Sequence, residues 1–138
     1  MTNRKKILLG LMALFLVTLG LTISFYLPYR ALKVDVSQVA EVTIAFSKED
    51  KKASLTEKTA REEVCEALNG MVMLRGLPAS PEGEYYTIEY LDAKGKVLKQ
   101  LVVLNEKEVI YRGFTYTVQG DTIDLTRLSK LDSENRDT

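Results

Sequence analysis

An uncharged apolar run over 7–27 limits what this chain can fold into more than any other feature. The run reads I-L-L-G-L-M-A-L-F-L-V-T-L-G-L-T-I-S-F-Y-L and contains no charged residue. As a helix rising about 1.5 Å per residue, it would be roughly 31 Å long, close to the thickness of the hydrocarbon core of a bilayer. The run therefore predicts a single transmembrane helix over 7–27.

Basic residues flank this run unequally. Arg4, Lys5 and Lys6 precede it, whereas Arg30 and Lys33 follow it. Basic residues are enriched on the cytoplasmic side of membrane helices. We therefore expect a single-pass cell-membrane protein with a cytoplasmic N-terminus, an extracytoplasmic C-terminal domain and the lipid bilayer as the partner of the helix.

A cleaved secretory signal is the alternative interpretation of the same run. Signal peptides also begin with basic residues, but their apolar cores usually contain only about 7–15 residues. The stretch that follows, 26–31, offers no cleavage site of the A-x-A type. The pattern favours an uncleaved signal-anchor, and the secreted alternative stays open.

The roughly 105 residues from Val34 onward are enough for one small domain with a modest core. All 19 acidic residues lie there, with only 14 of the 19 basic ones, so this part of the chain is acidic. An acidic domain is not expected to bind nucleic acid. We divide the chain into a basic cytoplasmic N-terminus, a transmembrane helix, a connector, an extracytoplasmic domain and a flexible tail, at 1–6, 7–27, 28–38, 39–131 and 132–138.

The first half of the domain combines a strand with a helix. Alternating apolar and polar residues predict a strand over 42–46, and a charged loop follows over 47–52. A helix is predicted over 59–69, with Thr59 and Glu62 at the spacing of a capping box. The next apolar run, over 71–74, is ambiguous between a helix end and a strand.

The second half predicts an antiparallel meander and a short C-terminal helix. Leu125, Leu128 and Leu131 have helical spacing, and Asp121 or Asp124 would cap that helix. The domain is therefore expected to be α+β, with the first helix packed on one face of the sheet. Turn residues separate four expected strands, at 85–91, 97–104, 109–112 and 114–118.

This order of elements resembles that of a known kind of domain. The segments that carry the resemblance are E-V-T-I-A-F-S, a helix ending in L-N-G, Y-Y-T-I-E-Y and V-I-Y-R-G-F-T-Y-T-V. Over 38–131 the chain resembles the YhfM-like small extracytoplasmic domains of Gram-positive bacteria, which occur on lipoproteins and on single-pass proteins. This chain departs from the lipoprotein members because it lacks the lipid-bearing cysteine. The resemblance implies a location and a fold, since such families are mostly of unknown function.

The residues that carry most enzyme chemistry are missing. The chain has no histidine, which removes the Ser-His-Asp and Cys-His arrangements and the commonest metal ligand. No serine is followed three positions later by lysine, and no glycine-rich phosphate-binding motif occurs. We therefore expect no enzyme, no cofactor and no metal. The carboxylates Glu62, Glu63 and Glu66 are interpreted as a solvated helix face, and a carboxylate-dependent enzyme remains the alternative.

Cys65 is the only cysteine, so an intramolecular disulfide is impossible. Its place beside Val64 on the expected helix favours a buried side chain over a redox-active thiol.

Five of the seven tyrosines lie on expected strands. The simpler interpretation is cross-strand packing in the core. If one sheet face stays exposed, however, the same side chains would form a recognition patch. The candidate binding residues are therefore Tyr85, Tyr86, Tyr90, Tyr111 and Tyr116.

The function expected from the sequence is that of a membrane-anchored extracytoplasmic binding protein. Its partner would be another cell-envelope protein, a peptide or a wall component. The alternatives are a structural accessory subunit of a membrane complex, a carboxylate-dependent enzyme, or a secreted protein with a cleaved signal.

Overall fold

The computed structural model describes residues 3–26, 30–49 and 51–135, and side chains of the first helix up to Leu21. Its helices are α1 (Asn3–Tyr26), the short 3-10 helix η1 (Val36–Gln38), α2 (Lys58–Asn69) and α3 (Leu125–Asn135). Its strands are β1 (Glu41–Phe46), β2 (Lys52–Leu55), β3 (Val72–Pro78), β4 (Tyr86–Leu91), β5 (Val97–Val103), β6 (Glu108–Tyr111) and β7 (Phe114–Gln119).

The strands form one antiparallel sheet of seven strands in the order β2-β1-β4-β5-β6-β7-β3. Strands β4 to β7 follow one another in sequence and in space, so the predicted meander is confirmed. The predicted first strand and the predicted helix over 59–69 are confirmed by β1 and α2. The α+β class of the domain is therefore as expected.

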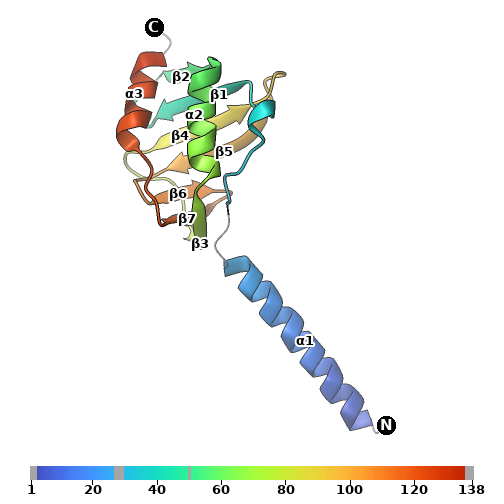
Figure 1. Ribbon diagram of the computed structural model, residues 1–138. Coiled ribbons are helices and arrows are strands. Elements are labelled where there is room, and N and C mark those ends of the chain that lie inside the picture. The colour runs from blue at the N-terminus through green and yellow to red at the C-terminus, as the bar shows by residue number, and fades with distance from the viewer. Residues whose placement is uncertain (1–2, 27–29, 50, 136–138) are drawn as a thin grey trace.

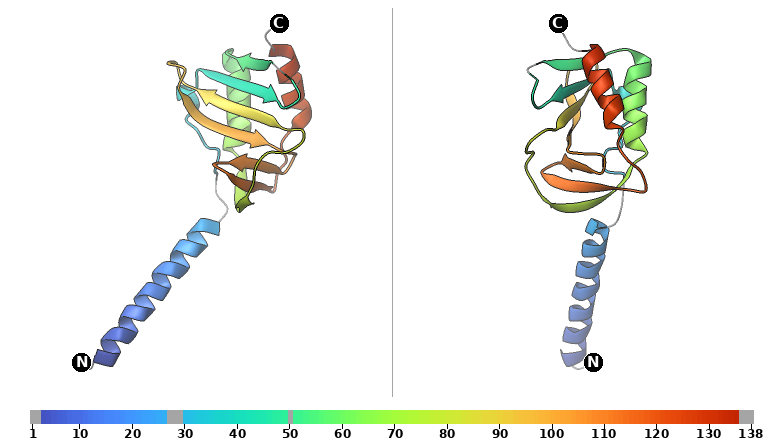
Figure 2. Two further views of the ribbon diagram at one scale, coloured as in Figure 1. Left: turned by 180° about the vertical axis from the view of Figure 1, so that it is seen from behind. Right: turned by 90° about the vertical axis from the view of Figure 1, so that its left-hand side faces the viewer.

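Helices α2 and α3 cover the same face of the sheet (Figures 1 and 2). The apolar stripe of α2 buries Val64, Cys65 and Leu68, while α3 buries Leu128 and Leu131. Helix α3 packs against β2 and β1 at one edge of the sheet. The two helices thus lie side by side above the core.

The centre of the core comes from β4 and β5. Ile88, Tyr90, Leu101 and Val103 expose no more than 1% of their surface. Their alternation with half-exposed neighbours is the two-residue period of a sheet with one covered face. Strand β5 occupies the middle of the sheet, with three strands on either side of it.

The expected connector over 28–38 contributes to this core where it is described. Ala31 is 4% exposed and Leu32 is fully buried. The side-chain amide of Asn69, at the end of α2, holds this segment in place: Val34 N donates to Asn69 Oδ1 at 2.8 Å, and Asn69 Nδ2 donates to Val34 O at 2.9 Å. The segment is therefore part of the domain rather than a spacer before it.

Local predictions failed at the two edges of the sheet. Strand β2 begins at Lys52, in the expected charged loop, and β3 continues the ambiguous run as far as Pro78. The capping box was also wrong, because α2 begins after Glu57 and no side chain caps it. Asp124 does cap α3, since its Oδ1 accepts a hydrogen bond from Arg127 N at 2.9 Å.

The predicted tail begins one turn too early. Helix α3 continues to Asn135, and Asp132 is only 2% exposed. The remaining tail residues, 136–138, lie outside the described residues.

Helix α1 projects away from the domain in Figure 1. Its described large apolar side chains are 44–68% exposed. Among the residues that the structure describes, no helix is both long enough and apolar enough to cross a membrane.

This finding contradicts the transmembrane helix predicted over 7–27. The predicted single-pass anchor, the lipid bilayer as its partner, and the localisation with a cytoplasmic N-terminus and an extracytoplasmic domain rested on that helix, and they are corrected with it.

Candidate functional site

The five candidate tyrosines do not share one surface. Tyr90 and Tyr116 are at most 1% exposed, and Tyr111 is 8% exposed, so these three side chains belong to the core. They fit the packing interpretation of the tyrosines. Tyr85 and Tyr86 are half-buried and stay candidates for binding.

Tyr85 and Tyr86 line a hollow of about 250 Å³ at the end of β4. Phe46 on β1 lies beside Tyr86, with their ring centroids 5.0 Å apart. Leu125, at the start of α3, closes the hollow from the helix side. Aromatic pairs at this distance stabilise each other in addition to the area that they bury, so packing accounts for part of this arrangement.

A second concavity lies between the two helices, and we call it the α2–α3 groove. Its volume is about 180 Å³. A cavity of about 150 Å³ accommodates a benzene ring, so the groove has room for one large apolar side chain. Its walls are apolar and come from both helices and the turns beside them: Val64, Leu68, Met71, Ile123, Leu128 and Leu131.

The groove exists because of a small residue on α2. Ala67 lines it and is exposed, so its methyl group leaves the space between the helices unfilled. Val64 and Leu131, which also line the groove, are buried and belong to the apolar stripes of α2 and α3.

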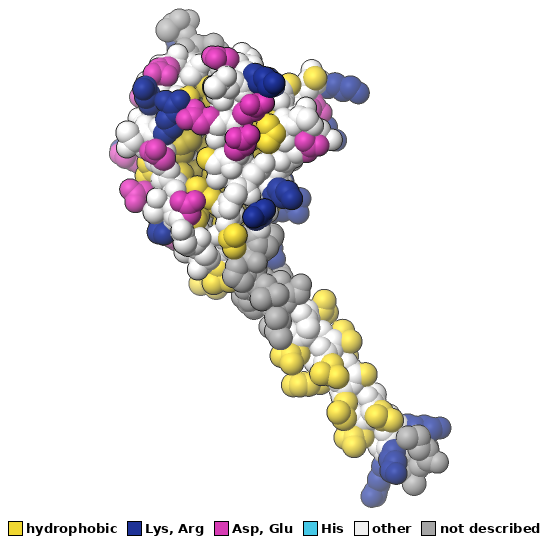
Figure 3. All heavy atoms as spheres, viewed as in Figure 1, with side chains coloured by type: hydrophobic (Ala, Val, Ile, Leu, Met, Phe, Trp, Pro, Cys, Tyr) yellow, Lys and Arg dark blue, Asp and Glu magenta, His cyan; other side chains and the backbone are white. Residues whose placement is uncertain are grey.

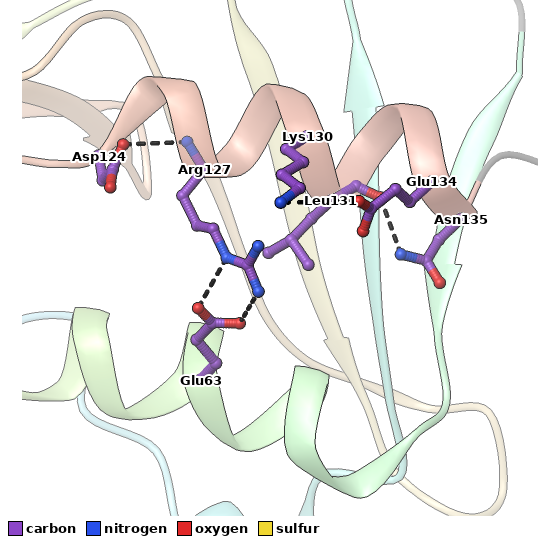
Figure 4. Close-up of polar contacts among 7 residues, drawn as sticks. All are labelled: Glu63, Asp124, Arg127, Lys130, Leu131, Glu134 and Asn135. Carbon is purple, nitrogen blue, oxygen red and sulfur yellow. Dashed lines mark hydrogen bonds and ion pairs between the residues drawn. The ribbon is translucent and has the colours of Figure 1, made fainter.

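A bidentate ion pair crosses the groove, as Figure 4 shows. Arg127 Nε lies 2.7 Å from Glu63 Oε1, and one terminal guanidinium nitrogen lies 2.8 Å from Glu63 Oε2. The hydrogen bond from Arg127 holds the pKa of the Glu63 carboxyl below its usual range, and the same bond raises the pKa of Arg127. Both side chains stay about 40% exposed, so water screens the pair and its effect on stability is small.

A polar hollow of about 350 Å³ continues beyond this ion pair. It shares Glu63, Arg127 and Leu131 with the groove, so the ion pair stands between the two spaces. Glu57 and Glu134 line the polar hollow, and Asp124 lies at the opposite end of the groove.

The surroundings of the groove are acidic. Figure 3 shows yellow apolar side chains between α2 and α3, with magenta acidic groups along both sides of them. Arg127 is already paired with Glu63, and Lys130 lies 4.0 Å from Glu134. Among the residues that the structure describes, the other two carboxylates here, Glu57 and Asp124, form no ion pair, so a basic group of a ligand would meet favourable charge.

The arrangement does not favour acid-base chemistry. A general acid at neutral pH needs a raised pKa, whereas the pKa of Glu63, the carboxyl at the centre of this region, is lowered. Among the described residues, no group of three or more histidine, cysteine, aspartate or glutamate side chains could hold a metal ion. The geometry fits the binding of a ligand better than the conversion of one.

Cys65 lies in the core under α2, where burial raises the pKa of its thiol to about 11. The free thiol of an unfolded chain titrates near 9. Between these two values the unfolded chain loses this proton and the folded chain keeps it, so rising pH lowers the free energy of unfolding.

We therefore expect an alkaline loss of stability that depends on Cys65. Between pH 9 and 11 it should amount to about 2 kcal/mol, and Cys65→Ala should remove it. Urea denaturation of both chains at pH 7, 9 and 11 measures the difference. At neutral pH, a thiol reagent should modify the folded chain far more slowly than the unfolded one. Equal rates for the two states would contradict the burial of this thiol.

The sequence did not reveal the groove. Glu63 had been assigned to a solvated face, and its partner Arg127 lies 64 residues away along the chain. The available signals were the small Ala67 within the apolar stripe of α2 and the leucine spacing of α3. Neither signal says that the two helices lie side by side.

The chain matches no protein-family model, no curated protein and no solved structure.

Proposed function

We propose that the domain binds a partner protein through the α2–α3 groove. The ligand is a short peptide segment with one large apolar side chain next to a lysine or arginine. The single observation that carries this proposal is an apolar groove of about 180 Å³ with acidic side chains along its rim.

Each part of such a ligand has a counterpart in the site. The apolar side chain enters between Leu68 and Leu128, where it is removed from water. The basic group lies near Glu57 in the polar hollow. The ion pair between Glu63 and Arg127 joins the two helices where the groove meets the polar hollow. A binding role needs no catalytic residue, in keeping with the absence of histidine from the chain.

The proposed kinship with YhfM-like domains rests on the order of the elements and on the aromatic-glycine-aromatic pattern at Tyr111, Gly113 and Tyr116. This kinship is compatible with a small binding domain and implies no particular activity.

A pair of short peptides tests the proposal. In the full chain, acetyl-Lys-Leu-Leu-Lys-amide should shift the methyl NMR signals of Val64, Leu128 and Leu131, whereas the peptide with glutamate in place of lysine should bind at least tenfold more weakly. Ala67→Phe places a ring over the groove and should lower the affinity about tenfold, which corresponds to about 1.4 kcal/mol.

Glu66→Phe is the matched control, because it adds the same ring to an exposed position of α2 that does not line the groove. Its affinity should stay within twofold of the unmodified chain. If both peptides leave the groove signals unchanged, or if the two phenylalanine variants behave alike, the groove is not the binding site.

A further inference from the structure

A basic cluster interrupts the acidic surface at the other end of the sheet. Lys99 on β5 and Arg112 after β6 both contact the ring of Tyr111: Lys99 Nζ lies 5.3 Å and Arg112 Cζ lies 5.2 Å from its centroid. Arg30 and Lys33 are exposed on the segment that passes beside them. Figure 3 shows Lys and Arg side chains gathered where the domain meets the segment that leads to α1.

The ammonium group of Lys99 is held in place rather than free to swing. Its Nζ donates a hydrogen bond to the backbone oxygen of Ala31 at 2.9 Å, and Ala31 is itself buried. An ammonium group has three donors, so two remain for a ligand. Lys99 is only half-exposed, and burial together with repulsion from Arg112 lowers its pKa.

Within the described part of the chain, neither Lys99 nor Arg112 forms an ion pair with an acidic side chain. The charged group that perturbs Lys99 is another cation, Arg112. The domain has more carboxylates than basic groups, yet these two cations lie together without a carboxylate. Their mutual repulsion is unfavourable unless an anion binds to them.

The backbone conformation of Arg112 is a second, independent observation. Arg112 has φ +52° and Gly113 has φ +82° in the tight turn between β6 and β7. Such two-residue turns strongly prefer asparagine or aspartate before glycine, because an ordinary side chain is strained at positive φ. Arginine is unfavourable at this position of the turn, which points to a role for its guanidinium group.

We propose that Lys99 and Arg112, which both contact the ring of Tyr111, form a binding site for a phosphate group. Phosphate suits this set of donors because the planar guanidinium can bind two of its oxygens while the ammonium binds a third. Arg30 and Lys33 add positive charge nearby and favour a doubly charged anion over a carboxylate. The ligand is a free phosphate ion or a small phosphate monoester.

Titration of the full chain with inorganic phosphate at constant ionic strength tests this site. Amide NMR signals of Lys99, Tyr111 and Arg112 should shift together and saturate, with a dissociation constant of about 1 mM. O-phosphoserine forms the second arm. Equal binding of both would identify the monoester group as a ligand, whereas binding of inorganic phosphate alone would identify the free ion.

Arg112→Asn separates the site from the fold. Asparagine suits the left-handed turn better than arginine, so this variant should unfold at the same urea concentration or a higher one, yet bind phosphate at least tenfold more weakly. Lys94→Asn removes the same charge from the exposed turn between β4 and β5 and should leave the affinity within twofold. Absence of a saturable shift at tenfold the expected constant, or equal losses in the two variants, would overturn the proposal.

Discussion

Replacing Leu32 by alanine is expected to lower the free energy of unfolding by about 3 kcal/mol. Leu32 precedes the sheet and the main helices of the domain, yet its side chain is completely buried. Two hydrogen bonds between Val34 and Asn69 hold this segment against the end of α2, so the backbone cannot move in to fill the space that alanine leaves. The loss should therefore include both the transfer of the side chain and the cavity.

Urea denaturation of the full chain, followed by circular dichroism, measures this loss. Lys33→Ala is the control, because its side chain is exposed and adjacent in sequence. Substitutions at such positions usually change the free energy of unfolding by less than about 0.5 kcal/mol. Similar midpoints for the two variants would mean that the segment does not belong to the core.

Tyr90→Ala should lower the free energy of unfolding by more, about 4 kcal/mol, because it removes the largest side chain at the centre of the sheet and leaves a cavity there. The hydroxyl group contributes nothing to this loss, since Tyr90 Oη is buried and has no hydrogen-bond partner among the described residues. Tyr90→Phe keeps the ring and removes an unpaired polar group, so it should leave the stability unchanged or raise it by up to about 1 kcal/mol.

Urea denaturation of both variants measures these changes. Tyr90→Phe removes only the hydroxyl group, so it is the control for the loss of the ring in Tyr90→Ala. Burial also raises the pKa of Tyr90, whereas an unfolded tyrosine ionises near 10. The folded chain therefore loses stability as the pH rises above 10, and Tyr90→Phe should make this loss less steep. A large loss of stability in Tyr90→Phe at neutral pH would show that the hydroxyl group is bonded after all.

Elements whose conformation is decided by interactions between residues close together in the sequence were predictable. Helix α2 and the meander from β4 to β7 have clear periodicity, and Asp124 caps α3 with the local bond that its position suggests. In each case the deciding interactions join residues close together in sequence.

Elements that depend on distant partners were missed. Strand β2 begins with the exposed Lys52, and it is a strand because Ala53 and Leu55 pair with β1 and are buried near α3. Strand β3 pairs with β7, from Val72 with Gln119 to Pro78 with Phe114, so the paired residues are 36 to 47 positions apart. Edge strands of this kind carry weak local signals, because a neighbour on one side only decides their conformation.

The candidate site divides in the same way. The spacing of the tyrosines placed Tyr90 and Tyr116 on strands but could not say which sheet face the helices cover. That face is set by the packing of α2 and α3, and it puts Tyr90, Tyr111 and Tyr116 in the core. The groove and the basic cluster each join residues from different elements, such as Glu63 with Arg127 and Lys99 with Arg112.

The packing of α3 on β2 and β1 also bears on how the chain folds during synthesis. A ribosome makes the first strands long before it makes α3, and chains fold from the N-terminus as they emerge. Until α3 arrives, the apolar side chains of Ala53 and Leu55 face water at an open edge of the sheet. A nascent chain that stalls before Leu125 therefore exposes apolar side chains on an edge strand and is prone to aggregate. Helix α3, the last helix, is the element that covers them.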